Sequence, residues 1–197
     1  MVKLQAVVAV QLHHVCLVDE EGGTVSRISG TDKFDVPEIE DMSVIGASGN
    51  TEKAYVTGQI LGTYLSQMGF NVDFAPVADV LSNPENTVVK RRSFGEDPHL
   101  VTEMTRALAE GLHSKGIYSS YKHFPGHGAT SGDTHEGYSY TEKTLDELME
   151  CELIPFKSAA EQKMPMIMVG HISVPNVTGN NCPASLSEIM IHEVLRE

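Results

Sequence analysis

The stretch that decides the fold is Lys122-His123-Phe124-Pro125-Gly126-His127-Gly128-Ala129-Thr130-Ser131-Gly132-Asp133-Thr134-His135. It directly follows a short apolar run, residues 117–121, which predicts a strand. Polar side chains at the carboxyl end of a parallel strand occupy the place where α/β enzymes carry their sites. The stretch holds three histidines, a lysine and an aspartate, which cannot all be core residues. It therefore predicts a functional loop.

The rest of the chain alternates between strand-like and helix-like patterns. Apolar runs rich in β-branched residues predict further strands near residues 15–18, 72–77 and 166–169. Apolar residues at steps of three or four predict amphipathic helices over residues 54–68 and 100–112. Strands that alternate with helices imply a parallel sheet with crossover connections, so the predicted class is α/β. Periodicity alone leaves a closed barrel and an open, doubly wound sheet equally possible.

Two helix starts are marked by their residue types. Asp97 can cap the helix that follows it, and Pro98 occupies the first turn, where its missing N–H is not needed. Thr144 and Glu147 have the spacing of a capping box, which predicts a third helix from this point. Pro155 lies inside that helical pattern, so we expect it to kink the helix or to split it in two.

The net charge of the chain bears on its partners, and its cysteine content bears on its location. A net charge of −13 repels a phosphate backbone, and the basic residues form no run longer than residues 90–92, so nucleic acid is not expected as a partner. The three cysteines are widely spaced and odd in number, which favours a reducing, cytoplasmic location. The small apolar patch in residues 1–14 is far shorter than the ~20 residues that span a membrane. We read those residues as an atypical extension of one domain, 1–197.

Asp133 and His135 flank a single residue in the loop. A carboxylate at this spacing can fix the tautomer of the imidazole and stabilise its charged form, which suits histidine to proton transfer. The same pair, taken alone, also occurs in ordinary solvated loops. Together with His123 and His127 these residues are also possible metal ligands. The intervening proline and glycines exclude the helix that would place the histidines on one face, so we predict no metal site and no cofactor.

Five stretches, taken in this order, resemble the catalytic domain of glycoside hydrolase family 3, specifically its bacterial β-N-acetylglucosaminidase branch. They are residues 18–23 (VDEEGG), 71–80 (NVDFAPVADV), 92–98 (RSFGEDP), 122–135 and 183–187 (PASLS). The resemblance covers nearly everything after about residue 17. It implies a TIM-type (β/α) barrel, of which this chain would hold roughly half to five-eighths.

The resemblance also implies a substrate and a set of site residues. The substrate would be a terminal β-linked N-acetylglucosamine of a peptidoglycan fragment, a chitooligosaccharide or a related glycan. Sugar-binding roles are implied for Asp19, Arg27, Arg92, Lys122 and His123. The acid/base of a retaining mechanism would be His135, oriented by Asp133. Family members specific for glucose or xylose lack this loop, which favours a hexosaminidase over a β-glucosidase.

The resemblance is incomplete at the end of the chain. In the family, the aspartate nucleophile follows shortly after a Leu-Arg pair that Leu195 and Arg196 resemble, and this chain stops at Glu197. Glu20, Asp79 or a partner subunit are the possible substitutes. The alternative to a glycosidase is a catalytically impaired fragment or a sugar-binding module that associates with itself.

Two structural expectations follow from the resemblance. A partial barrel leaves open sheet edges and uncovered apolar faces, so we expect a homo-oligomer, with a two-fold dimer as its simplest form. Neighbouring strand residues point to opposite faces, so Lys122 and His123 can both face a site only if the backbone between them is unusual, for example through a cis peptide bond.

Overall fold

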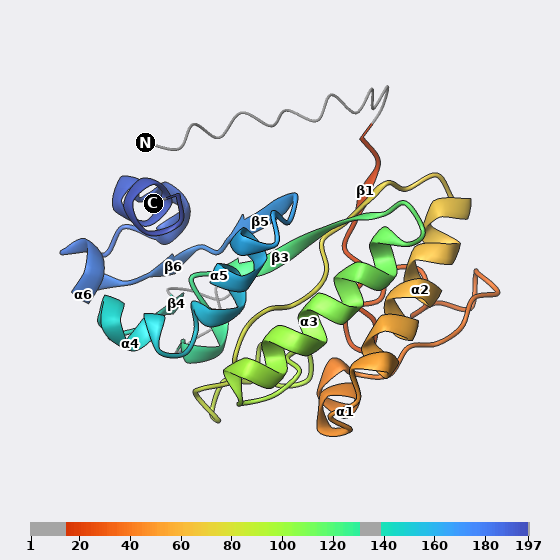
Figure 1. Ribbon diagram of the computed structural model, residues 1–197, viewed down its shortest axis with the longest axis horizontal. Coiled ribbons are helices and arrows are strands. Elements are labelled where there is room, and N and C mark those ends of the chain that lie inside the picture. Colours follow the sequence, from red (N-terminus) through yellow and green to blue (C-terminus); the bar gives the residue numbers. More distant parts are fainter. Residues whose placement is uncertain (1–14, 131–138, 197) are drawn as a thin grey trace.

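The computed structural model describes residues 15–130 and 139–196 (Figure 1). Its main sheet has four parallel strands in the order β1-β2-β3-β5. These strands are β1 (Leu17–Val18), β2 (Val72–Asp73), β3 (Tyr118–Phe124) and β5 (Met166–Val169). Each strand begins in a run predicted as a strand, although β3 extends three residues beyond its run of 117–121, and the order of the strands in the sheet follows their order along the chain. A doubly wound sheet reverses its order at a switch point, whereas a barrel wall does not, so the sheet is part of a barrel.

The register of the sheet brings the carboxyl ends of its strands together. Val18 lies opposite Asp73, and Asp73 lies opposite Ser119 on β3. The residues that follow these positions therefore emerge at one edge of the sheet. Asp19 follows β1 directly, and Lys122 lies three residues beyond Ser119 on β3.

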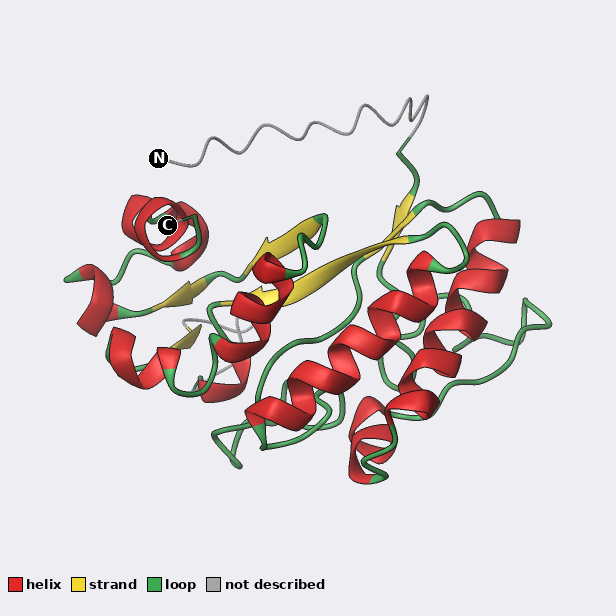
Figure 2. Ribbon diagram, viewed as in Figure 1, coloured by secondary structure: helices red, strands yellow, loops and turns green. Residues whose placement is uncertain are grey.

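Three helices form a row beside the sheet, each in contact with the next (Figure 2). They are α2 (Thr51–Gln67), α3 (Pro98–His113) and α5 (Ile154–Glu161). Right-handed crossovers keep the helices on one face when strands are added in a single direction. The start of α3 is as predicted, because the Asp97 side chain accepts a hydrogen bond from the His99 amide at 2.9 Å.

The third predicted helix is divided in two. Thr144 and Glu147 form a capping box at the start of α4 (Leu145–Met149). Pro155 occupies the first turn of α5, where it needs no hydrogen-bond donor. The expected split at this proline is confirmed.

Several elements were not predicted. A second, two-stranded parallel sheet joins β4 (Ser139–Tyr140) to β6 (Ile172–Ser173). The other additions are α1 (Met42–Ala47), α6 (Pro175–Thr178), the 3-10 turns His127–Ala129 and Ala184–Leu186, and the π-helical turn Ile189–Val194. The strand predicted over residues 72–77 is shorter than expected. It ends at Asp73, and Pro76, which has no N–H for the ladder, follows in a cis peptide bond.

The helices α2 and α3 approach each other closely because glycines lie between them. Leu61, Leu65 and Leu108 are almost fully buried in this interface. A Cβ atom added at Gly58 would lie 2.1 Å from the carbonyl oxygen of Leu108, and one added at Gly111 would lie 2.2 Å from that of Tyr55. No side chain fits at either position, so the two glycines set the spacing of the helical layer.

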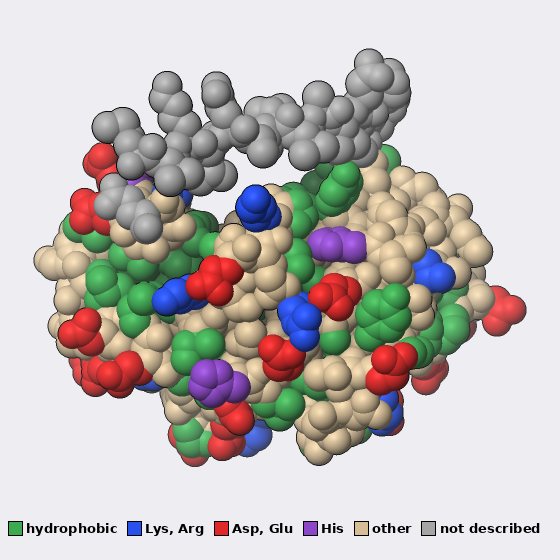
Figure 3. All heavy atoms as spheres, in the orientation of Figure 1, with side chains coloured by type: hydrophobic (Ala, Val, Ile, Leu, Met, Phe, Trp, Pro, Cys, Tyr) green, Lys and Arg blue, Asp and Glu red, His purple; other side chains and the backbone are tan. Residues whose placement is uncertain are grey.

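The surface over the helices is mixed in charge. Figure 3 shows Lys and Arg side chains scattered singly among acidic ones on this face. Within residues 15–130 and 139–196, no helix is both long and apolar enough to cross a bilayer.

Candidate active site

The candidate site lies where the chain leaves the ends of β1 and β3. Lys122 belongs to β3 yet is only 1% exposed, and His123, the next residue, is largely buried. The peptide bond between them is cis, which confirms the expectation of an unusual backbone at this position. Both side chains enter the same polar cluster.

A buried carboxylate, Glu21, pairs with both cations of this cluster. Glu21 accepts two hydrogen bonds from Arg92, at 2.8 Å from Nε and 2.7 Å from Nη2, and its Oε1 lies 2.5 Å from Lys122 Nζ. Burial by itself would raise the pKa of Glu21, but the hydrogen bonds and charges of Arg92 and Lys122 outweigh burial and lower that pKa. Lys122 also donates to Asp19, whose side chain is 35% exposed. Charged donors are thus held in place at the rim of the site.

His123 is held on both sides of its ring. Nδ1 lies 2.7 Å from Asp79 Oδ2, and Nε2 lies 3.5 Å from Arg92 Nη2. Asp79 is fully buried, and its Oδ1 also accepts from the backbone amides of His123 at 3.1 Å and His127 at 2.6 Å. Burial would raise the pKa of Asp79, but these contacts with His123 and His127 lower it, so the carboxylate is charged.

The loop after β3 is packed tightly against the loop after β2. A Cβ atom at Gly128 would lie 1.9 Å from the carbonyl oxygen of Val80. The amide of Asn86 donates to the carbonyl oxygens of His127, at 2.8 Å, and of Thr130, at 3.2 Å. The motif therefore needs glycine at position 128. Asn86 holds the end of the described part of the motif, residues 122–130, through the hydrogen bonds to His127 and Thr130.

The structure brings together four of the seven site residues predicted from the sequence: Asp19, Arg92, Lys122 and His123. It does not bring in Arg27, whose side chain is exposed and makes no hydrogen bond or ion pair within the described residues. The backbone amide of Arg27 donates to Glu20 instead. Asp133 and His135 lie outside the described residues, so their roles stay predictions.

Neither Glu20 nor Asp79 is placed to act as the nucleophile. Glu20 is fully buried and accepts from three backbone amides, of residues 27–29, and from the hydroxyls of Ser29 and Tyr64. Burial would raise the pKa of Glu20, but these hydrogen bonds lower it. Both oxygens of Asp79 are likewise occupied. A carboxylate that is buried and saturated with donors cannot reach an anomeric carbon.

Sequence reasoning missed the roles of Glu21 and Asp79. Both residues lie in stretches that carry the family resemblance, but nothing in their spacing distinguished them from neighbouring acids. His171, which lies shortly after β5, is exposed, and its Nδ1 lies 2.8 Å from Ser185 Oγ.

Two further features lie outside this cluster. In the part of the chain that the structure describes, no group of three or more His, Cys, Asp or Glu residues is arranged to hold a metal ion.

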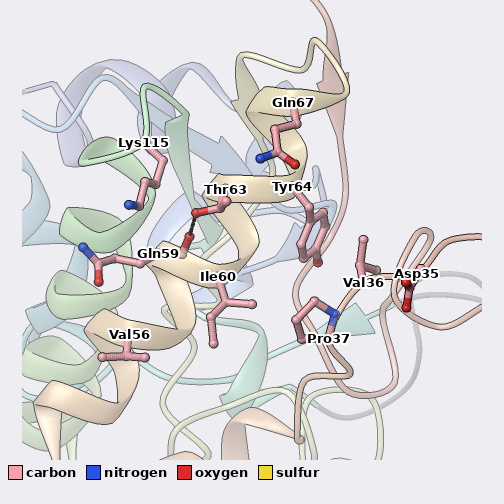
Figure 4. Close-up of a pocket in the computed structure, with 10 residues that line it drawn as sticks. All are labelled: Asp35, Val36, Pro37, Val56, Gln59, Ile60, Thr63, Tyr64, Gln67 and Lys115. Carbon is pink, nitrogen blue, oxygen red and sulfur yellow. Dashed lines mark hydrogen bonds between the residues drawn. The ribbon is translucent and has the colours of Figure 1, made fainter.

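A surface groove of about 420 Å³ runs along the outer side of α2, between residues 35–37 and Lys115 (Figure 4). It shares no residue with the cluster around Lys122, so we do not assign the site to it.

Known proteins resemble the chain over most of its length. Beta-hexosaminidase LpqI from Mycobacterium tuberculosis is 38% identical over 175 residues, which cover 89% of this chain and 44% of that protein. Beta-hexosaminidase from Neisseria gonorrhoeae is 36% identical over 187 residues, which cover 92% of this chain and 50% of that protein. The chain thus spans about half the length of the curated relatives it matches.

Solved structures agree with the sequence comparison. The crystal structure of NagZ from Neisseria gonorrhoeae in complex with N-trifluoroacetyl-D-glucosamine superposes with a TM-score of 0.82 at 34% identity, covering 93% of this chain and 54% of that one. A glycosyl hydrolase of the GH3 family from Mycobacterium smegmatis superposes with a TM-score of 0.79 at 40% identity, covering 88% and 52%. The family described as the glycosyl hydrolase family 3 N terminal domain matches residues 3–197, so the chain belongs to glycosyl hydrolase family 3.

Proposed function

We propose that this chain supplies the sugar-binding part of a β-N-acetylhexosaminidase that removes terminal β-linked N-acetylglucosamine. The observation that carries the proposal is the convergence of Asp19, Arg92, Lys122 and His123 at the strand ends of a barrel wall. Active sites of such barrels are built at this face. The names of the relatives, and the N-trifluoroacetyl-D-glucosamine in one solved neighbour, support the same class of substrate.

The charge balance of the cluster fits a neutral sugar. Glu21 and Asp19 together offset Arg92 and Lys122, so the N–H groups of the two cations can donate to hydroxyls without leaving a strong positive field that would favour an anion. Asp19 is partly exposed and can accept from a sugar hydroxyl. Paired donors and acceptors of this kind are what a carbohydrate with several hydroxyls requires.

The catalytic part of the proposal rests on the family resemblance. His135 would act as the general acid/base of a retaining mechanism and Asp133 would orient it, with a carboxylate nucleophile from outside the cluster described above. No cofactor takes part in this scheme. A cytoplasmic location is proposed with it, because Cys16, Cys151 and Cys182 are all free thiols.

A chromogenic β-N-acetylglucosaminide tests the proposal directly. We expect the chain to hydrolyse it in preference to the matching β-glucoside, and His135→Ala to lose most of that activity, with a smaller loss for Asp133→Ala. Equal rates for parent and His135→Ala would rule out the acid/base role.

A second function, sugar binding without turnover, is favoured by one observation. Glu20, Glu21 and Asp79 are all buried and engaged, so none of them offers a free nucleophile. Calorimetric titration with N-acetylglucosamine separates the two functions. Binding without turnover supports the sugar-binding module, whereas the absence of both excludes a sugar site in this chain.

A further inference from the structure

The side chain of Asp79 makes its hydrogen bonds with the end of β3, at His123, and with the loop that follows, at His127. One carboxylate oxygen meets the ring of His123 at Nδ1, and the other meets the backbone amides of His123 and His127. The side chain is fully buried, so it cannot touch a ligand itself. Whatever it contributes to the site must pass through His123.

The contacts of the ring define which nitrogen carries the proton. A charged carboxylate only accepts hydrogen bonds, so a distance of 2.7 Å between Asp79 Oδ2 and His123 Nδ1 places the proton on Nδ1. Nε2 of the neutral ring is then an acceptor. Arg92, which can only donate, lies 3.5 Å from Nε2 on the opposite side. Asp79 therefore selects the tautomer, and the 3.5 Å contact with Arg92 is long enough to leave the single lone pair of Nε2 for a ligand.

We propose that Asp79 is a positioning residue, which fixes His123 in the tautomer whose Nε2 accepts a hydrogen bond from a sugar hydroxyl. The sugar in this statement rests on the proposed function, whereas the tautomer does not. A carboxylate behind a histidine commonly sets the tautomer and orientation of the ring in this way. Because His123 is 16% exposed, the edge of its ring can reach a ligand that Asp79 cannot.

The substitution Asp79→Asn reverses the hydrogen-bond pattern with little change in shape. The amide oxygen can still accept from the backbone of His127, while the amide N–H₂ group faces Nδ1 and can only donate to it. The proton must then move to Nε2, where it faces the guanidinium of Arg92. His123 would present a donor where the parent presents an acceptor.

Asp73→Asn is the matched control. Asp73 is also fully buried and also accepts from a backbone amide, that of Glu20 at 3.0 Å. Burial raises the pKa of Asp73 well above its usual value, and within the described residues Asp73 makes no hydrogen bond to a histidine ring, so the amide leaves the contacts of His123 unchanged. The control therefore reproduces the cost of a buried amide without altering His123.

Nitrogen-15 NMR of the histidine side chains in the full chain reads the tautomer without any substrate. The signals of His123 are assigned by their loss in His123→Gln. We expect Nδ1 to be protonated in the parent and in Asp73→Asn, and the proton to move to Nε2 in Asp79→Asn. A parent ring protonated on Nε2 overturns the proposal even if Asp79→Asn fails to fold, and so does an Asp79→Asn ring that keeps its proton on Nδ1.

Titration with N-acetylglucosamine then tests the consequence for binding. Loss of one hydrogen bond corresponds to about tenfold weaker affinity in Asp79→Asn, with Asp73→Asn unchanged. A moved proton with unchanged affinity overturns the link to sugar recognition. If the parent does not bind N-acetylglucosamine, the proposed function fails, and the NMR result alone decides the role of Asp79.

Discussion

Replacing Glu21 with glutamine removes the buried carboxylate that pairs with both Lys122 and Arg92. Removing one partner of a buried ion pair costs about 3–5 kcal/mol, because the other charge stays buried without compensation. Glu21 is 2% exposed and Lys122 is 1% exposed, so solvent screens this pair little. After the substitution Lys122 still pairs with Asp19, and the Arg92 side chain is 14% exposed to solvent. The expected loss of unfolding free energy therefore lies at the lower end of that range, about 3 kcal/mol.

The stabilisation that Glu21 provides also depends on pH, in a direction set by its lowered pKa. Since the folded state lowers the pKa of Glu21, the stabilisation is fully present above the unfolded pKa of about 4.3 and is lost as pH falls through the folded value. Urea unfolding followed by circular dichroism should show Glu21→Gln about 3 kcal/mol less stable than the parent at pH 7, with the difference shrinking in acid.

An exposed ion pair provides the control for this measurement. Glu103 pairs with Arg106 on the surface of α3, with both side chains more than 40% exposed, so Glu103→Gln should cost less than about 1 kcal/mol. A Glu21→Gln loss no larger than that of Glu103→Gln, or one that does not change with pH, would refute the assignment of Glu21 as the charge that holds the cluster together.

Three further predictions concern the cluster, the helical layer and the sheet edges. Arg92→Lys loses the paired hydrogen bonds to Glu21 that a lysine cannot copy, so thermal unfolding should occur at lower temperature, and an unchanged midpoint would contradict the geometry. Gly58→Ala places a methyl group 2.1 Å from the carbonyl oxygen of Leu108 and should cost about 1–3 kcal/mol in urea unfolding; a neutral effect would mean that α2 and α3 are not in close contact. In the described part of the sheet β1 and β5 each have one neighbour, and Leu17 is 50% exposed, so light scattering should detect a dimer or larger species; a monomer of 21.4 kDa would contradict this expectation.

The parts of the fold that could be predicted are those with a repeated physical pattern. The apolar runs located all four strands of the main sheet, and the steps of three and four residues located α2 and α3. Local side-chain chemistry located the starts of α3 and α4, since Asp97 and Thr144 cap their own helices. The small β4–β6 sheet left no such pattern, because each strand is two residues long and its partner lies more than thirty residues away.

The polar residues of the site could be predicted from the sequence, but the carboxylates that support them could not. Lys122 and His123 were found because polar residues at a strand end are unusual in a core. The carboxylates behind them depend on contacts between distant parts of the chain: Glu21 meets Arg92 across 71 positions, and Asp79 meets His123 across 44. Only the folded sheet brings these residues together, so no spacing in the sequence could identify them.

The buried carboxylates explain how the site can keep its cations. Lys122 is almost fully buried, and a charge in such a place is costly unless a charge of opposite sign accompanies it. Glu21 supplies a buried negative charge. Asp19, which is partly exposed, is then the carboxylate of the cluster that a ligand can reach. Arg92 and Lys122 can then donate to a sugar while Asp19 and His123 accept from it. A ligand that lacks one of the matching hydroxyls would leave a site group unpaired, and such a loss discriminates more strongly than a missing apolar contact. Deoxy analogues of N-acetylglucosamine should therefore bind with different affinities, and equal binding of all of them would show that these four side chains do not contact the sugar.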